Sequence, residues 1–464
     1  MQSAVLPRTF LTTRQVLLAP VAVVLTAVRA VVDRPALLAA ATIVLVCLPA
    51  GSRDLTSAVH VTPADIGSAG LVTAVVLRVL AGHRPASSRL WVVLAGVVVA
   101  ASLATLASPD VATSATGFAR YLQLFVIVPL AVAVAVRDRR DVKLICTTLL
   151  AMALVEGALG THQYLTGTGA SFSGQGVRAV GTFSAQDIMG MPTVVGYALV
   201  VAVGLAIALV GRAALGLVVI AALLVVPLLL SLSRGAVVAT AGAVAAMLLV
   251  AGRQLMARAI VFGTAAVVLL AGTSAEASDL VTARVASIAS SVTNPDGSVN
   301  DRYALWQTAI DMWRDRPVTG VGLKMFPAYR DAYAPMNLSA SSDVADPKIG
   351  FTRQPLLTPH NMYLLVLSEQ GLIGAVAFAA FLAGLMGAAW RRTRRVMVGH
   401  RPAGRRTDGG LASVAAVGIV AITALTFVSG DVGGPSTVLM STMLGLALWW
   451  AIQPIPPPDE GGGR

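Results

Sequence analysis

The sequence is short of charged residues and of cysteine, and each shortage excludes a class of protein. Only 12% of the 464 residues are charged, whereas 56% are hydrophobic. A soluble domain of this length needs a mixed, polar surface, so lipid must take the place of the missing polar groups. Cys47 and Cys146 both fall inside apolar runs. They therefore predict neither a disulfide framework nor a cysteine metal site.

Lysine is also scarce, although the net charge is +12. The only lysines are Lys143, Lys324 and Lys348, and arginine supplies the remaining positive charge. These basic residues lie mostly in short gaps between apolar runs rather than along one soluble face. Membrane orientation explains that distribution better than nucleic-acid binding does. We therefore expect a lipid bilayer, and no nucleic acid, as a partner.

Long apolar runs predict an all-α, polytopic membrane protein with about twelve spanning helices. The runs approach the roughly 20 residues that a bilayer core requires. Their continuous apolarity, without alternation, favours helices over barrel strands. The expected spans are 36–51, 63–80, 90–107, 112–136, 144–160, 188–210, 214–232, 234–251, 258–274, 361–390, 411–429 and 434–452.

Loop charges predict the orientation of these helices. Every second connection is basic, so the positive-inside rule places those connections and both termini in the cytoplasm. Residues 1–35 are then a cytoplasmic or interfacial segment and 453–464 a disordered cytoplasmic tail. If the apolar stretch 16–32 spans the membrane instead, the N-terminus lies outside. The remaining divisions are helices 1–9 in 36–274, a large extracytoplasmic loop in 275–360 and helices 10–12 in 361–452.

The large loop is unusually long for a structureless connection, and such loops are commonly functional. Within it, apolar residues recur at helical spacing and predict a short amphipathic helix: Leu305, Trp306, Ala309, Ile310 and Trp313. Two interpretations fit this helix equally. It either lies at the membrane interface, with its tryptophans as anchors, or covers an active site.

Among the arginines on the expected outer side, which run against the charge rule, three are candidates for function. Arg178 is in the loop 161–187, Arg234 begins a span, and Arg302 opens the amphipathic helix. Each alone fits a snorkelling or ion-paired role, but together they predict an anion site, because the arginine fork matches phosphate oxygens. No Asp-x-Asp motif occurs to bind a magnesium-bridged diphosphate. We therefore expect neither a metal nor another cofactor.

His360 is the candidate general base, because histidine is the usual base near neutral pH. It stands where the large loop re-enters the membrane, with Asn361 beside it to orient a substrate or the ring, and Glu369 further along the same helix. The plainer alternative is helix capping or surface exposure. For three other charged residues in or near spans the default role is buried ion pairing, with Arg120 also a possible supporting residue: Asp65, Glu156 and Arg120.

The segment 360–378, HNMYLLVLSEQGLIGAVAF, closely resembles the loop-to-helix signature of the O-antigen ligase and O-antigen polymerase superfamily. The segments RAVGTF (178–183), SLSRG (231–235), RYALW (302–306) and RPVTGVGLKMF (316–326) resemble its other motifs, in the same order. The resemblance covers about residues 60 to 450.

This resemblance implies a GT-C type fold and a metal-independent, inverting transfer of glycan from a polyprenyl (undecaprenyl) diphosphate carrier. It also implies that Arg178, Arg234 and Arg302 hold the diphosphate and that His360 activates the acceptor hydroxyl. The expected location is a bacterial plasma membrane, with the active site on the extracytoplasmic side.

Two functions within the superfamily remain open, and one outside it. A ligase would pass the glycan to a glycan, lipoglycan or cell-wall acceptor, whereas a polymerase would join lipid-linked repeat units. A transporter or flippase for lipid-linked glycan would bind its anionic substrate with the same arginines. That class predicts internal repeats and charges near the bilayer midplane, and we find no convincing repeat.

Overall fold

The structure is a computed structural model that describes residues 33–48, 53–56, 59–82, 90–172, 176–183, 187–209, 211–252, 297–346, 350–399 and 413–452, with Leu255 and Ala257. The interfacial segment expected in 1–35, the span expected at 258–274 and the expected tail 453–464 lie wholly or mostly outside these residues.

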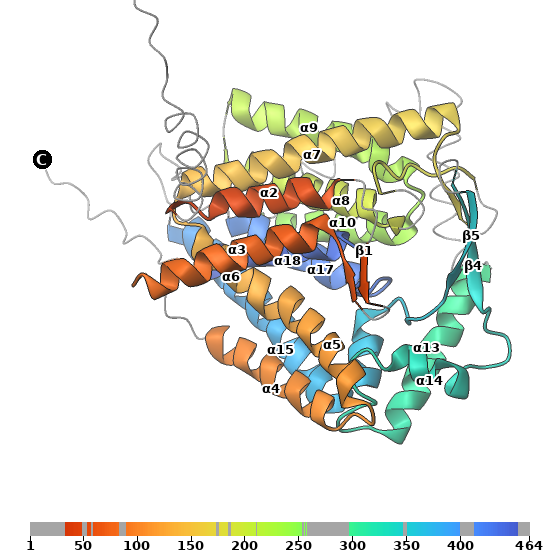
Figure 1. Ribbon diagram of the computed structural model, residues 1–464. Coiled ribbons are helices and arrows are strands. Elements are labelled where there is room, and N and C mark those ends of the chain that lie inside the picture. The colour runs from red at the N-terminus through yellow and green to blue at the C-terminus, as the bar shows by residue number, and fades with distance from the viewer. Residues whose placement is uncertain are drawn as a thin grey trace, which may run out of the picture.

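Helices form most of the described fold (Figure 1). The helices are α2 (Ala36–Val46), α3 (Pro63–Leu80), α4 (Leu90–Leu106), α5 (Val111–Leu122), the π-helical turn η1 (Gln123–Ile127), α6 (Val128–Ala135), α7 (Arg139–Thr166), α8 (Gly190–Ala208), α9 (Arg212–Leu230), α10 (Arg234–Ala251), α13 (Gly297–Asp315), α14 (Phe326–Tyr333), α15 (Met362–Gly399), α17 (Ser413–Thr426) and α18 (Ser436–Ile452). Because η1 joins α5 to α6 without a break, Val111–Ala135 is one continuous helix.

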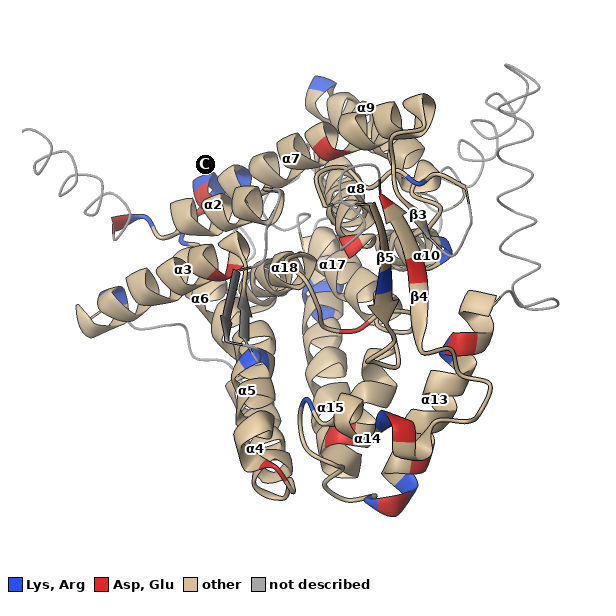
Figure 2. Ribbon diagram, turned by 45° about the vertical axis from the view of Figure 1, so that its right-hand side comes forward, with Lys and Arg blue, Asp and Glu red and all other residues tan. Residues whose placement is uncertain are grey.

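Seven of the described helices are long and apolar enough to cross a membrane, judged by length and composition. Four shorter apolar helices accompany them: α2, α4, α17 and α18. Every expected span within the described residues coincides with a helix, and the agreement is closest for α3, which fills 63–80. Figure 2 shows that the long helices are mostly uncharged and that charges gather near helix ends and on α13 and α14.

Local sequence explains where α3 begins. The Thr62 hydroxyl accepts the backbone N–H of Asp65 at 3.3 Å, and the Asp65 carboxylate accepts the backbone N–H of Thr62 at 3.0 Å. Pro63 occupies the first helical position, where its missing N–H costs nothing. This capping box fixes Asp65 in the first turn of α3, where it becomes part of a polar network described below.

Strands accompany the helices, which the expectation of an all-α fold did not include. β1 (Arg53–Thr56) pairs antiparallel with β2 (Val59–Val61). A second, antiparallel sheet has the order β3 (Ser171–Phe172), β4 (Ser341–Asp346) and β5 (Gly350–Pro355). Since β3 follows α7 and β4 follows α14, this sheet joins two segments far apart in the sequence. β4 and β5 lie beside α13 at the right of Figure 1.

The amphipathic helix expected in the large loop is α13. Leu305 and Ala309 are buried, whereas Trp306 and Trp313 are partly buried. α13 packs on α15, and the Trp306 indole N–H donates to the carbonyl oxygen of Pro359 at 3.0 Å. The helix therefore packs against the protein and contacts the residue that precedes His360.

The helix α15 is broken at Gly371, where φ is 63°. A Cβ atom at Gly371 would lie 2.3 Å from the carbonyl oxygen of Val318, and one at Gly320 (φ 68°) would lie 2.4 Å from the backbone of Glu369. Both positions need a left-handed conformation and a close backbone approach, which only glycine allows. Gly320 and Gly371 thus allow the segment 316–326 to pack directly against the break in α15.

Candidate functional site

A cavity of about 350 Å³ brings together residues from widely separated segments. Its lining includes Arg178 from the connection between α7 and α8, Arg302 from α13, and His360 from the turn before α15. We call it the histidine cavity. Three of the four residues singled out in the sequence as anion-binding or basic thus line one space, although they are separated by up to 182 positions, from Arg178 to His360.

Arg178 is positioned by contacts between its motif and α7. Gln163 on α7 accepts the backbone N–H of Gly181 at 2.8 Å and donates to its carbonyl oxygen at 2.8 Å. Glu156, also on α7, accepts the backbone N–H of Thr182 at 2.9 Å and its hydroxyl at 2.7 Å. The prediction that Glu156 forms an ion pair is therefore wrong for the described contacts, because Thr182 donates two hydrogen bonds to this carboxylate instead.

Arg234 is not among the described residues that line the histidine cavity. It is the first residue of α10, after a turn in which Leu232 has a positive φ of 52°. A Cβ atom on the adjacent Gly235 would lie 2.3 Å from the hydroxyl of Ser429, and Ser429 does line the cavity. The start of α10 thus packs against Ser429, a residue that lines the cavity.

His360 adopts a strained backbone conformation. Its φ is 47°, in the left-handed region that non-glycine residues rarely occupy. Burial lowers the pKa of the His360 imidazole, and the positive charge of Arg302 adds to this effect while the Asp431 carboxylate opposes it. A lowered pKa favours the neutral ring, which is the form that can accept a proton.

Asp431 is a cavity residue that the sequence analysis missed. It lies between α17 and α18 and accepts hydrogen bonds from the Thr358 hydroxyl and the backbone N–H of His360. Its Oδ2 atom is buried and has no hydrogen-bond partner among the described residues. Burial raises the pKa of this carboxyl, against the charges of His360 and Arg302. The only signal in the sequence was an acid in the short outer connection 430–433.

The side chains of Asn361 and Glu369 form hydrogen bonds with backbone groups. The Asn361 side chain accepts the backbone N–H of Leu364 at 3.1 Å and donates to the Val428 carbonyl oxygen at 3.1 Å. The Glu369 carboxylate accepts the N–H of Phe326 at 3.0 Å, as well as the backbone N–H groups of residues 324 and 325. Asn361 thus caps α15 and joins it to the segment after α17, while Glu369 holds the segment before α14.

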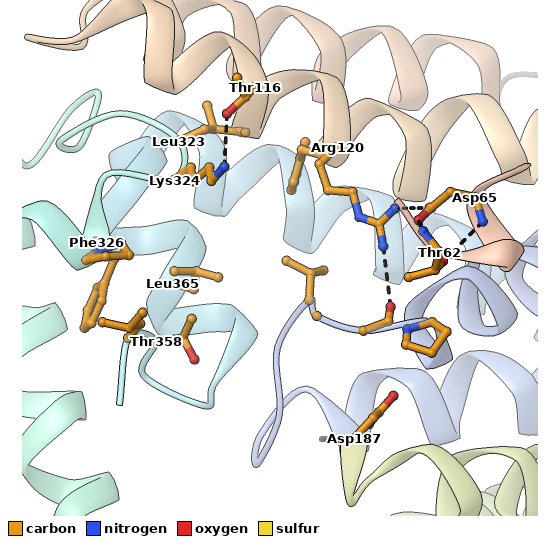
Figure 3. Close-up of a pocket in the computed structure, with 18 of the residues that line it drawn as sticks. Thr62, Asp65, Thr116, Arg120, Asp187, Leu323, Lys324, Phe326, Thr358 and Leu365 are labelled. Atoms are coloured by element: carbon orange, nitrogen blue, oxygen red, sulfur yellow. Dashed lines mark hydrogen bonds and ion pairs between the residues drawn. The ribbon is translucent and has the colours of Figure 1, made fainter. Parts of the chain in front are cut away.

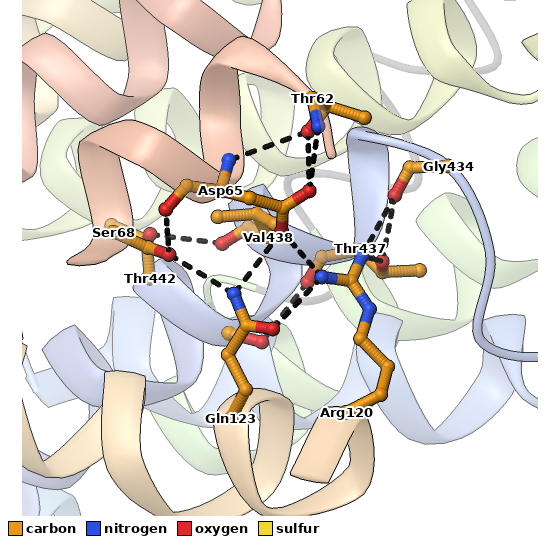
Figure 4. Close-up of polar contacts among 10 residues, drawn as sticks. Thr62, Asp65, Ser68, Arg120, Gln123, Gly434, Thr437, Val438 and Thr442 are labelled. Carbon is orange, nitrogen blue, oxygen red and sulfur yellow. Dashed lines mark hydrogen bonds and ion pairs between the residues drawn. The ribbon is translucent and has the colours of Figure 1, made fainter. Parts of the chain in front are cut away.

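Arg120 forms the ion pair expected for it and lies at the centre of a polar network (Figure 4). Its guanidinium contacts the Asp65 carboxylate and donates to Gln123 Oε1 at 3.0 Å. It also donates to the Gly434 carbonyl oxygen at 3.4 Å and to Thr437 Oγ1 at 3.3 Å. The network therefore joins α3, the α5–η1 helix and the start of α18.

A second cavity, of about 640 Å³, lies beside this network (Figure 3). Its lining includes Arg120, Lys324 and Phe326, and we call it the lysine cavity. Both cavities are lined by Asp187, Gly433 and Gly434, so they meet at this wall. Two large spaces therefore adjoin each other at the same end of the helices.

Asp187 stands in the shared wall and accepts hydrogen bonds from the hydroxyl and N–H of Ser436 and from the N–H groups of Met189 and Gly190. Its Oδ2 atom is buried without a hydrogen-bond partner among the described residues. Burial raises the pKa of this carboxyl to about 6, although these hydrogen bonds oppose the shift. Asp187 could not be singled out from the sequence, because an isolated aspartate before an apolar run resembles an ordinary helix cap.

The histidine cavity combines cationic side chains with one partly buried base. Two guanidinium groups can hold and neutralise an anion, and a neutral imidazole beside a carboxylate can take a proton from a hydroxyl group. Among the described residues, no group of three or more histidine, cysteine, aspartate or glutamate side chains is placed to hold a metal ion.

The apolar helices, with a cationic and histidine-bearing cavity at one end, define the class: a multi-pass membrane protein with a polar site. Residues 217–379, from α9 to the middle of α15, match a family model described as O-antigen ligase. The match confirms the resemblance found in the sequence and supports an O-antigen ligase-like family for this stretch of the chain. The match includes Arg234, Arg302 and His360, whereas Arg178 precedes it. No curated protein matches the chain.

Proposed function

We propose that this protein transfers a glycan from a polyprenyl diphosphate carrier to a cell-surface acceptor, as an O-antigen ligase-like glycosyltransferase. The observation that carries the proposal is that Arg178, Arg302 and His360 line one cavity. The family match supports the same class of enzyme. The carrier is undecaprenyl diphosphate or a similar polyprenyl diphosphate, and the acceptor is a glycan, lipoglycan or cell-wall component.

In the proposed reaction the acceptor hydroxyl attacks the anomeric carbon of the donor sugar. His360 removes the hydroxyl proton as the new carbon–oxygen bond forms, and the bond from the anomeric carbon to the phosphate oxygen breaks with its electron pair on that oxygen. Single displacement inverts the anomeric centre. Lipid diphosphate is a good leaving group once its charge is stabilised, so one base and several cations suffice.

Arg178 and Arg302 are the proposed ligands of the diphosphate. A guanidinium presents donors in a fork that matches two phosphate oxygens, and each charge-assisted bond contributes about 1.5 to 3 kcal/mol. Arg234 is proposed to contribute through the start of α10, which lies against Ser429 of the cavity wall. This arrangement neutralises the leaving group without a metal ion.

Asp431 is proposed as a positioning residue for the base. Its carboxylate accepts the backbone N–H of His360, and therefore holds the strained turn that presents the imidazole. When His360 takes the acceptor proton, the adjacent carboxylate stabilises the imidazolium that forms. Transfer is proposed to occur on the extracytoplasmic side of a bacterial plasma membrane, with both termini in the cytoplasm.

A polysaccharide polymerase is the second candidate, because it uses the same donor chemistry and differs only in its acceptor. Deleting the gene in the producing bacterium distinguishes the two. Full-length glycan that accumulates on the lipid carrier indicates a ligase, and single repeat units on the carrier indicate a polymerase. A flippase or transporter would instead leave lipid-linked glycan on the cytoplasmic face.

Substitution of His360 tests the proposed base. His360→Ala should lower transfer by roughly 100- to 10,000-fold, the usual contribution of a general base, while undecaprenyl diphosphate still binds. His162→Ala is the matched control, because His162 is exposed and lines neither cavity. Full turnover by the His360 variant would exclude this residue as the base.

Substitution of the arginines tests the diphosphate site. Arg302→Ala and Arg178→Ala should each weaken undecaprenyl diphosphate binding by about tenfold or more. Arg314→Ala, also on α13, is the control because Arg314 is exposed and pairs with Asp311. Unchanged binding in both cavity variants would contradict the site. EDTA should leave transfer unchanged; loss of transfer that magnesium restores would refute the metal-independent mechanism.

A further inference from the structure

The lysine cavity has no role in the donor chemistry above, although it is the larger of the two spaces, at about 640 Å³ against about 350 Å³. Its walls combine aromatic side chains, Tyr121, Phe183 and Phe326, with the charged Arg120 and Lys324. A sugar ring has apolar C–H faces and hydroxyl edges, so it can satisfy both kinds of wall. A polyprenyl chain in this cavity would leave charged groups against hydrocarbon, which is costly.

The lysine cavity lies next to the proposed base, where an acceptor must bind. It shares Asp187, Gly433 and Gly434 with the histidine cavity. Thr358, which also lines the lysine cavity, contacts Asp431 in the histidine cavity and lies two residues before His360. A molecule in the lysine cavity therefore adjoins the residues that surround the proposed base.

Lys324 is held in an unfavourable backbone conformation at the edge of this cavity. Its φ is 60°, and the buried Glu369 carboxylate accepts its backbone N–H along with those of the next two residues. The side chain reaches across to α5, where its ammonium donates to Thr116 Oγ1 at 3.3 Å (Figure 3). Backbone strain at a cavity-lining charged residue points to a role in binding.

The other cation of the cavity is already engaged. The Arg120 guanidinium contacts Asp65, Gln123, Gly434 and Thr437. The Lys324 ammonium has three donors on a flexible chain. It can therefore turn from Thr116 to a ligand oxygen without loss of the helix contacts that Arg120 maintains.

We propose that the lysine cavity binds the acceptor glycan and that the Lys324 ammonium donates a hydrogen bond to one of its hydroxyl groups. The proposal rests on the proposed function, because it takes the histidine cavity as the donor site. It assigns the donor and the acceptor to separate cavities that meet at Asp187 and Gly434. The acceptor hydroxyl reaches the base from the lysine cavity side.

Lys324→Gly separates binding from folding, because glycine adopts a positive φ without strain. The variant should unfold at the same temperature as the wild type or above it, and should bind undecaprenyl diphosphate equally well. Transfer, measured in the deletion strain as the ratio of transferred to lipid-linked glycan, should fall by roughly 10- to 100-fold. Lys324→Arg, which keeps the cation, should restore part of the transfer. Wild-type transfer by Lys324→Gly would overturn the assignment of Lys324.

Filling the cavity provides a second, independent test. Thr116→Trp places a large ring into the space, whereas Ala115→Trp adds the same ring to an exposed position on the same helix. Only Thr116→Trp should abolish transfer, and both variants should still bind undecaprenyl diphosphate. If Thr116→Trp transfers normally, the cavity is not the acceptor site. If it loses undecaprenyl diphosphate binding, the cavity holds the donor and the proposal is wrong.

The failure of this inference is distinct from failure of the proposed function. The proposed function fails if the wild-type protein does not bind undecaprenyl diphosphate in an Arg302-dependent manner. The further inference fails if that binding is present while Thr116→Trp transfers at the wild-type rate, and its assignment of Lys324 fails if Lys324→Gly does so.

Discussion

Asp187→Asn tests the burial of the carboxylate that stands between the two cavities. Asp187 has a raised pKa of about 6 against an ordinary value of 3.8, because burial outweighs its hydrogen bonds. The asparagine side chain has nearly the same shape and can keep the carbonyl contacts to the start of α8, but it cannot ionise. The substitution thus removes the charge with little change in packing.

The magnitude and sign follow from the pKa shift. A carboxyl whose pKa is raised on folding favours the folded state while protonated, and this contribution is lost as pH rises through about 6. A shift of about 2 units, at about 1.4 kcal/mol per unit, corresponds to about 3 kcal/mol. Since Asp187 is partly exposed, solvent screening should reduce this contribution to the free energy of unfolding to about 2 kcal/mol. The wild type should lose this amount relative to Asp187→Asn between pH 4 and pH 7.

The assay is unfolding by SDS in mixed micelles at several pH values, for the wild type, Asp187→Asn and the control Asp331→Asn. Asp331 is exposed, so its variant controls for the loss of one carboxylate. The difference in unfolding free energy between Asp187→Asn and the wild type should grow as pH rises, and it should grow by more than the difference between the control and the wild type. Parallel curves for all three proteins would refute the reasoning.

Two further substitutions test the packing that supports the cavities. Arg120→Ala should lower the free energy of unfolding by about 2 kcal/mol, between the values for exposed and buried ion pairs, because the Arg120 and Asp65 side chains are 31% and 13% exposed. The same SDS titration measures this loss. If the losses caused by Arg120→Ala and Asp65→Asn simply add in the double variant, the two residues are not energetically paired. Gly320→Ala should cost several kcal/mol because strain at φ 68° adds to the 2.4 Å approach to Glu369. Gly350→Ala, at φ 78° but in open space, should show the effect of backbone strain alone. Equal losses in unfolding temperature for Gly320→Ala and Gly350→Ala would contradict a contribution from the close approach to Glu369.

The membrane helices were the most predictable part of the fold. α3 fills the expected range 63–80 because a Thr-Pro start and a continuous apolar run mark both its beginning and its length. The short α2, which ends at Val46 rather than at 51, shows the limit of hydropathy alone. The sheet formed by β3, β4 and β5 was not predicted, because its strands are short and pair segments that are far apart in the sequence.

The site was partly predictable for a related reason. Arg178, Arg302 and His360 stand out individually, because each is a charged or basic group on the expected outer side of an apolar protein. Asp187 and Asp431 do not stand out, since single aspartates beside apolar runs are common as helix caps. Their importance arises from burial against distant segments, and sequence spacing contains no information about that burial.

Asp187, Gly433 and Gly434 line both the histidine cavity and the lysine cavity, and under the proposed roles of these cavities this shared wall has a practical consequence for inhibitor design. A compound that joins a diphosphate mimic in one cavity to a sugar in the other need cross only this short stretch of chain. Once either end is seated, the other experiences an effective concentration in the millimolar range for a short flexible linker. Such a bisubstrate compound would bind more tightly than the two halves supplied separately, and its optimal linker length would measure the distance between the two reacting groups.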